Sequence, residues 1–219
     1  YQNTYQKNVN LGNRKNKYIY IKHDANFESV LYELNSKNIL INQASFIRLA
    51  KKMDYVNNVK PGKYLVLKNM GNKKLINLLK SGKQEKVSFT YNNIRTKEQL
   101  AGRVSNNLEV DSITLLNILN NDSILEKYRF NSKNIMSMFV AGTYSFDTWA
   151  IEPLQFMERM LEEYEKFWSD ERLSKANYIS LSSIDVTILA SIVQQEQQIK
   201  KDERPVIAGV YINRLNIGM

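Results

Sequence analysis

One acidic residue, Glu196, lies at a position where a helical pattern predicts an apolar side chain. From Ser183 onward, apolar residues recur at the steps of three and four that line one face of a helix. These residues are Ile184, Ile188, Leu189, Ile192, Val193 and Ile199. Glu196 follows Val193 by three positions and Ile192 by four. The pattern therefore predicts that its carboxyl group lies along the apolar face.

A carboxyl group in apolar surroundings can serve as a general acid. Burial disfavours the charged form and keeps such a group protonated near neutral pH. The protonated group can then donate its proton to a glycosidic oxygen as the bond breaks. Two structural alternatives stay open: Glu196 lies beyond the buried part of the face, or it forms an ion pair with Arg204 or Arg214.

A second helix is predicted directly after the first. Asp202 is expected to cap it, and Pro205 suits its first turn, where a backbone N–H is not needed. Gly209 would allow close approach to a neighbouring segment. Two helices joined by a short loop pack antiparallel, which would bring the polar donors Asn213 and Arg214 into the cleft of the candidate acid.

The first part of the chain predicts a small α+β module. Residues 18–23 alternate like a strand, residues 26–38 have helical spacing, and Asn42 begins a second helix. A Pro-Gly turn at 61–62 precedes a second strand, and residues 75–82 follow as a helix. Tyrosines in this module either fill its core or stack on sugars; they include Tyr18, Tyr20 and Tyr64.

From Lys86 onward the pattern is mainly helical. A strand over 87–91 leads into helices capped by Thr96 and Asp111, and one long helix is predicted over about 152–176. Its inward residues are expected to be Leu154, Met157, Leu161, Tyr164 and Trp168. The expected fold class is α+β, a strand-helix-helix-strand domain followed by a mainly helical domain.

Charge and composition limit the partners and cofactors. Residues 1–100 carry 19 Lys and Arg against 6 Asp and Glu, whereas residues 101–219 carry 12 against 16. The basic half suits an anionic partner, such as nucleic acid, lipid headgroups or a carboxylate-bearing cell-wall polymer, or it is a solvated lysine-rich surface. With no cysteine and a single histidine, His23, no metal site is expected. No cofactor is implied.

Apolar runs in the chain are short. Residues 186–193 fall far below the roughly 20 residues that cross a bilayer, and no signal peptide is visible. The chain begins at a tyrosine and stops one residue after Gly218. We expect a soluble, trimmed form of a longer protein that has a membrane anchor.

Several segments together resemble one family. ASIVQQE, residues 190–196, and ERPVIAGVYINRLNIGM, residues 203–219, are similar to the signature of the MltG (YceG-like) endolytic murein transglycosylases. Members of that family read roughly ASIVEKE, a short spacer, ER, then VFINRL and IGM. FVAGTYSF resembles the family segment with a Thr-Tyr pair, here Thr143 and Tyr144. The first half resembles a LysM-like domain, which the family would place there.

The resemblance implies a site and a reaction. Glu196 would be the catalytic acid/base, and Tyr144, Asn213 and Arg214 would bind substrate. The reaction would be non-hydrolytic cleavage of the β-1,4 bond between MurNAc and GlcNAc, which leaves a 1,6-anhydro-MurNAc end. The chain departs from the family at Gln194, which replaces the first glutamate of the signature, and it ends before the segment that would complete the cleft.

The implied organisation is a LysM-like domain over 17–85 and a catalytic domain over 86–219, truncated at its C-terminus. The implied partners are peptidoglycan glycan strands, cell-wall synthesis proteins and the cytoplasmic membrane, which a single-pass anchor would span with the catalytic part outside. Nucleic acid is not an expected partner. Two alternatives stay open, a non-catalytic peptidoglycan-binding module and a hydrolytic muramidase.

Overall fold

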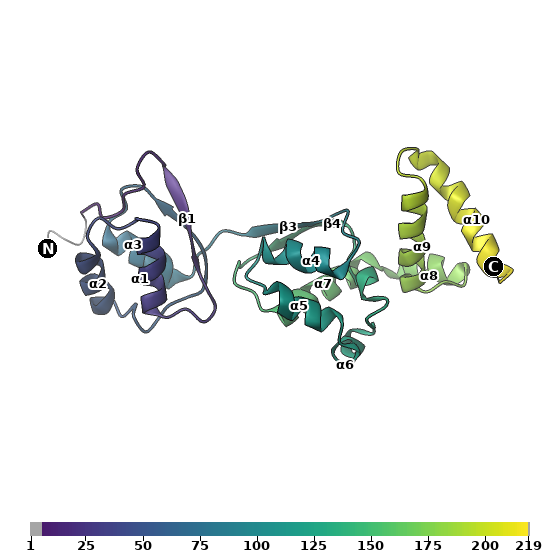
Figure 1. Cartoon of the computed structure of the whole chain (residues 1–219), viewed down its shortest axis with the longest axis horizontal. Coiled ribbons are helices and arrows are strands. Elements are labelled where there is room, and N and C mark those ends of the chain that lie inside the picture. Colours follow the sequence, from purple (N-terminus) through teal and green to yellow (C-terminus); the bar gives the residue numbers. More distant parts are fainter. Residues whose placement is uncertain (1–5, 219) are drawn as a thin grey trace. The chain divides into compact units, whose positions relative to one another are not determined.

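The structure, a computed structural model, describes residues 6–218. Its first elements are β1 (Asn16–Ile21), α1 (Phe27–Ser36), α2 (Gln43–Lys52), β2 (Gly62–Leu67), α3 (Asn72–Ser81) and β3 (Val87–Tyr91). Next come α4 (Lys97–Ser105), α5 (Ser112–Leu119), α6 (Asp122–Leu125), η2 (Glu126–Tyr128), η3 (Ile135–Met138) and β4 (Gly142–Phe146). The last are α7 (Pro153–Phe167), α8 (Asp170–Tyr178), α9 (Ser183–Glu196), η4 (Lys201–Glu203) and α10 (Arg204–Asn216) (Figure 1). Two small sheets among many helices confirm the α+β class.

Contacts within the chain divide it into two compact units. The first contains the described part of residues 1–90 together with 98–115 and 142–153. The second contains residues 91–97 and 116–141 and the described part of 154–219. The domains expected over 17–85 and 86–219 stay a prediction.

The first unit begins with the expected strand-helix-helix-strand module. β1 and β2 pair antiparallel, with Ile19 opposite Tyr64 and Tyr20 opposite Lys63. Because side chains alternate across a strand, Ile19 and Tyr64 are buried while Tyr20 lies on the outer face. The alternation that predicted these strands is therefore confirmed.

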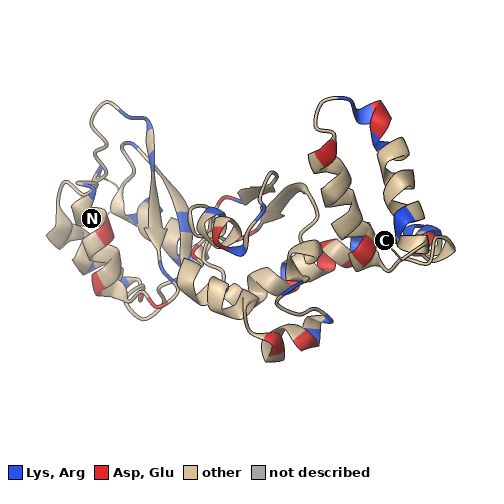
Figure 2. Cartoon of the chain, turned by 45° about the vertical axis from the view of Figure 1, so that its right-hand side comes forward, with Lys and Arg blue, Asp and Glu red and all other residues tan. Residues whose placement is uncertain are grey.

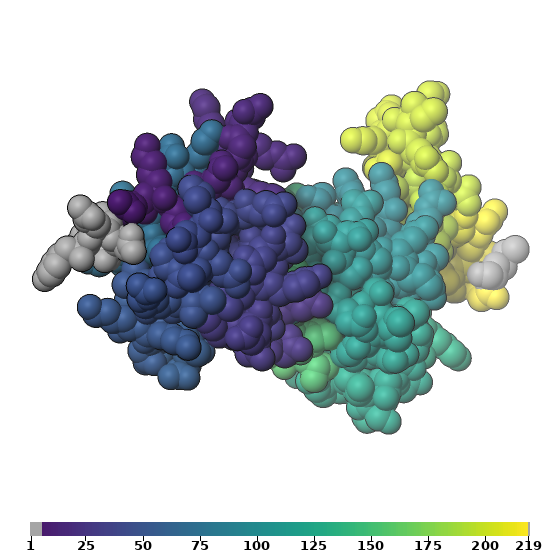
Figure 3. Space-filling view, turned by 60° about the vertical axis from the view of Figure 1, so that its left-hand side comes forward, coloured from purple at the N-terminus to yellow at the C-terminus, as the bar shows by residue number. Residues whose placement is uncertain are grey.

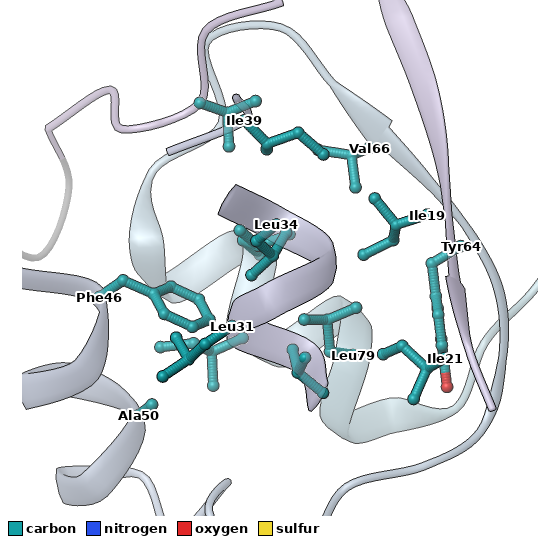
Figure 4. Close-up of a cluster of buried hydrophobic side chains, with 14 of the residues drawn as sticks. Ile19, Ile21, Leu31, Leu34, Ile39, Phe46, Ala50, Tyr64, Val66 and Leu79 are labelled. Carbon is teal, nitrogen blue, oxygen red and sulfur yellow. The ribbon is translucent and has the colours of Figure 1, made fainter. Parts of the chain in front are cut away.

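The core of the module lies between this pair of strands and three helices. The residues predicted to face inward from α1 are all buried; they are Phe27, Val30, Leu31 and Leu34. In Figure 4, Leu31 of α1 and Phe46 of α2 point toward each other, and Leu79 of α3 reaches the same cluster. Asn42 caps α2 as predicted, because its side chain accepts a hydrogen bond from the Ser45 amide at 2.9 Å.

A buried amide network anchors the segment before β1. Asn8 donates through Nδ2 to Asn72 Oδ1 at 2.6 Å, and its own Oδ1 accepts the Asn42 amide at 2.7 Å. Asn72 donates in turn to Ser45 Oγ at 3.0 Å. Asn8 and Asn72 are 4% and 2% exposed. The network ties residues before β1 to the starts of α2 and α3.

Replacement of Asn72 by Ala should destabilise the protein by about 1–3 kcal/mol, because the partners of a buried amide lose their hydrogen bonds. Urea unfolding measures this free energy. The matched control is Asn77→Ala in the same helix, where the side chain is exposed and the expected change is below about 0.5 kcal/mol. Equal effects of the two substitutions would contradict the role of the network.

The second unit contains two helices where one was predicted. α7 ends at Phe167, and Ser169 has an extended backbone with ψ of 161° before α8 begins. A serine at the N-cap followed by Asp170 and Glu171 in the first turn is a helix start, and it overrides the continuing apolar pattern. Leu154, predicted to face inward, is exposed. Tyr164 is buried as expected, edge-on to Phe130 with ring centroids 5.3 Å apart.

Candidate active site

The last two long helices form a hairpin. Ser182 and Asp185 start α9 with reciprocal hydrogen bonds between side chains and backbone amides. α9 ends at Glu196 because the backbone of Gln197 is extended, with φ of −134° and ψ of 92°. α10 then packs back against α9, with Pro205 in its first turn as predicted (Figure 1). In the space-filling view the hairpin is the yellow-green to yellow part of the chain (Figure 3).

The side chains of Glu203 and Arg204 hold the loop that connects α9 and α10. Glu203 Oε2 accepts a hydrogen bond from Gln197 Nε2 at 2.6 Å, and Arg204 Nε donates to the Gln197 carbonyl oxygen at 2.9 Å. Arg204 also donates to the Gln198 carbonyl at 3.4 Å. Carbonyl groups at the end of a helix need such donors. We name this set of contacts among Gln197, Gln198, Glu203 and Arg204 the loop clasp.

The loop clasp corrects two expectations about this region. Arg204 binds loop carbonyl groups, and neither Arg204 nor Arg214 forms an ion pair with Glu196, so that alternative for the glutamate is wrong. Asp202 does not cap α10, because Glu203 occupies the N-cap and no side chain makes a capping bond there. Acidic and basic residues gather at this end of the hairpin (Figure 2).

Glu196 is exposed at the end of α9, and its hydrogen-bond partner comes from α10. The Tyr211 hydroxyl group donates a hydrogen bond to Glu196 Oε1 at 2.9 Å. The prediction of a buried apolar face around Glu196 is wrong: Ile188 and Ile192 are 42% and 39% exposed, and only Val193 is buried. α10 leaves part of α9 uncovered. Helical spacing placed Glu196 on the face that carries Ile192 and Val193, but that face is only partly buried.

Tyr211 is the residue of this site that the sequence pattern missed. The hydrogen bond to the Glu196 carboxylate raises the pKa of the Tyr211 phenol, and partial desolvation and the negative charge of Glu196 act in the same direction. The Arg214 guanidinium lies 5.7 Å from the Tyr211 ring centroid and opposes this shift. In the sequence, Tyr211 lies within an apolar helical run, and this pattern predicts only a packing role for it.

The remaining predicted site residues occupy different places. Arg214 lies beside Tyr211, while Asn213 is exposed on α10. Tyr144 lies in β4 of the first unit and is 8% exposed. The close approach expected at Gly209 is wrong, because no described atom lies within 4 Å of an added Cβ there.

Residues 6–218 contain no group of three or more His, Cys, Asp or Glu side chains that could hold a metal ion. No single helix among them is long and apolar enough to cross a membrane; only α8 and α9 taken together, with a bend of 77° between them, have that length and composition. His23 is exposed and lies 3.9 Å from Glu152.

Together, the fold and the site define an α+β protein that presents an exposed glutamate, held by a tyrosine, on a helical hairpin. The chain belongs to the YceG-like family, whose model matches residues 19–219. Its last residue, Met219, lies outside the described part of the structure. This membership confirms the family that the signature in α9 and α10 indicated.

The fold is similar to that of a solved relative. The 2.6 Å crystal structure of a YceG-like protein from Listeria monocytogenes matches with a TM-score of 0.53 and 17% sequence identity. The match covers 94% of this chain and 72% of that chain. No curated protein matches the sequence. At this identity the structural likeness supports the fold.

Replacement of Glu196 by Gln should lower the pKa of Tyr211 toward its ordinary value. The carboxylate raises that pKa by accepting the hydrogen bond and by its negative charge, and an amide carries no charge. NMR titration of the labelled Tyr211 ring carbon measures the change. Glu165→Gln is the control, because Glu165 is an exposed glutamate of α7 outside the hairpin. If the pKa of Tyr211 were the same in Glu196→Gln as in the wild type, the hydrogen bond between Tyr211 and Glu196 would not exist in solution.

Proposed function

We propose that the protein is an endolytic peptidoglycan lytic transglycosylase. It cleaves the β-1,4 bond between MurNAc and GlcNAc inside glycan strands and leaves a 1,6-anhydro-MurNAc end. The observation that carries the proposal is the exposed Glu196 carboxyl group at the end of α9, fixed by Tyr211. Membership of the YceG-like family supports it.

In the proposed mechanism, Glu196 serves first as acid and then as base. The carboxyl group gives its proton to O4 of GlcNAc as the bond from that oxygen to C1 of MurNAc breaks. The resulting carboxylate takes the proton of the MurNAc C6 hydroxyl group while O6 bonds to C1. The proton returns to Glu196, so one carboxyl group completes the cycle without water.

Tyr211 and the loop clasp have a positioning role in this proposal. The bond from Tyr211 holds Oε1 of Glu196 and leaves Oε2 to face the sugar. Arg204 fixes the end of α9 through the Gln197 carbonyl group. A general acid must lie within hydrogen-bond reach of the oxygen that it protonates, so a mobile helix end would be less effective.

A hydrolytic muramidase needs a second carboxylate, which acts as nucleophile or activates water about 5–9.5 Å from the first. Glu203 is the nearest acidic residue in the signature, and it is engaged by Gln197 and by Lys200 at 2.9 Å. This engagement favours the transglycosylase over the muramidase.

Glycan binding by the first unit is a second proposed function, favoured by a hollow of about 430 Å³. Tyr20 and Trp149 meet edge to face in it, with ring centroids 4.9 Å apart. Lys63 and the amides of Asn106 and Asn107 also line it. Partly exposed aromatic rings beside amide groups suit a sugar, in keeping with the LysM-like order of this module.

The proposed substrate also sets a location. Peptidoglycan lies outside the cytoplasmic membrane, so the proposal requires the catalytic part on that face, held by a membrane anchor as in the expected family organisation. Cell-wall synthesis proteins, which supply new glycan strands, are the proposed protein partners.

Glu196→Gln should lower the release of anhydro-MurNAc fragments from purified glycan strands by at least about a hundredfold, because the amide cannot donate the proton. Mass spectrometry of the digest, with the protein in its natural length, measures the products. Glu165→Gln, at an exposed glutamate of α7 outside the hairpin, should retain anhydro products. Equal release by the wild type and Glu196→Gln would exclude Glu196 from the mechanism.

A further inference from the structure

A second, larger pocket lies within the second unit. It has a volume of about 830 Å³, within the size range of small-ligand sites. Residues of α8, residues of α9 and the segments around 91–95 and 133–141 line it. None of its lining residues belongs to the set that we assign to proton transfer. The pocket is therefore a separate feature of the catalytic helix.

The charge of this pocket is of one sign. Arg95, Lys133, Arg172 and Lys175 line it and are all exposed. Lys175 forms an ion pair with Glu171 at 2.6 Å, and Arg172 donates a hydrogen bond to the Phe167 carbonyl oxygen. None of the described residues that line it is Asp or Glu. The lining keeps an excess of positive charge after the Lys175–Glu171 pair is counted, which favours an anionic ligand, although residues 101–219 carry more acidic than basic side chains.

The uncharged part of the pocket adds a second requirement. Phe139, Phe167 and Trp168 supply an aromatic surface, and Arg172 is held over the Phe167 ring at 4.1 Å. The amide groups of Asn92 and Gln194 offer both donors and acceptors. Peptide bonds need such pairs of donors and acceptors, whereas a lipid chain needs only apolar contact. The lining therefore fits a short acidic peptide.

The lining of the pocket extends along α9 to the residue before Glu196. Gln194 and Gln195 line the pocket, and Glu196 follows Gln195 with a further turn of about 100°. A helix with its side chains is about 10–12 Å across. A group bound in the pocket would thus lie on the order of 10 Å from the bond that Glu196 cleaves, which is the reach of a substituent on the glycan strand.

We propose that this pocket binds the acidic peptide that MurNAc carries in peptidoglycan. The inference rests on the proposed function for the identity of the strand, but the pocket's preference for a carboxylate-bearing peptide follows from its own lining. The cations bind the peptide carboxylates, the amides pair with its backbone, and the aromatic rings contact its alanine side chains. The peptide thereby fixes which MurNAc unit faces Glu196.

Binding can be measured without any cleavage. The chain has two tryptophans, so Trp149→Phe leaves Trp168 in the pocket as the only one for fluorescence. Calorimetry uses the chain with Trp149 intact, because Trp149 lines the hollow of the first unit. The probes are the disaccharide GlcNAc-MurNAc with a tetrapeptide, the same disaccharide without the peptide, and the free tetrapeptide. This disaccharide contains no MurNAc-GlcNAc bond, so the proposed reaction leaves it intact. Trp168 fluorescence and titration calorimetry report the dissociation constants.

We expect the peptide-bearing disaccharide to bind at least about tenfold more tightly than the disaccharide alone, and to change Trp168 fluorescence. Lys133→Gln with Arg172→Gln should weaken that binding by at least about tenfold, because charge-assisted hydrogen bonds are lost, and each single substitution should have a smaller effect. The control removes two exposed lysines elsewhere, Lys51→Gln with Lys52→Gln, and should leave binding unchanged.

Three results would overturn the inference: equal affinity for both disaccharides, no binding of the peptide-bearing probe by calorimetry, or equal losses in the pocket and control variants. Circular dichroism verifies that each variant is folded. Cleavage of peptide-free glycan strands by the wild type, together with absent peptide binding, would retain the proposed function and reject this site. Peptide binding without cleavage of any strand would retain the site and reject the function.

Discussion

The geometry of the candidate site depends on the loop clasp that ends α9 at Glu196. Arg204 satisfies carbonyl groups just past the helix end, and Glu203 binds the side chain of Gln197. These contacts turn the chain so that α10 runs back along α9 and Tyr211 meets Glu196, 15 residues away in sequence. Without the clasp, α9 has no fixed end, and the carboxyl group has no fixed partner.

The position of Glu196 also carries an electrostatic cost. The last turn of a helix bears partial negative charge, so a carboxylate there is less favourable than one in the first turn. The hydrogen bond from Tyr211 offsets part of this cost and orients one oxygen. Glu196 and part of the lining of the cationic pocket both lie on α9, so a single rigid element would relate the cleaved bond to the peptide that the MurNAc unit carries.

Local sequence patterns predicted the helices and strands better than they predicted which residues these elements bury or contact. Alternation and helical spacing predicted β1, β2 and the inward face of α1, because these signals lie within a few residues. The exposure of Glu196 was not predictable, since it depends on how much of α9 the next helix covers. The bonds between Asn8 and Asn72, 64 residues apart, left no local signal. Tyr211 looked like a packing residue, and only the return of α10 reveals its partner.

Cleavage of purified glycan strands in ¹⁸O-labelled water tests the central claim most directly. If Glu196 directs the C6 hydroxyl group of MurNAc onto C1, every new MurNAc end is an anhydro sugar without ¹⁸O. That result is the one this account predicts. New reducing ends that carry one ¹⁸O atom would mean that water attacks C1, and they would contradict the transglycosylase mechanism.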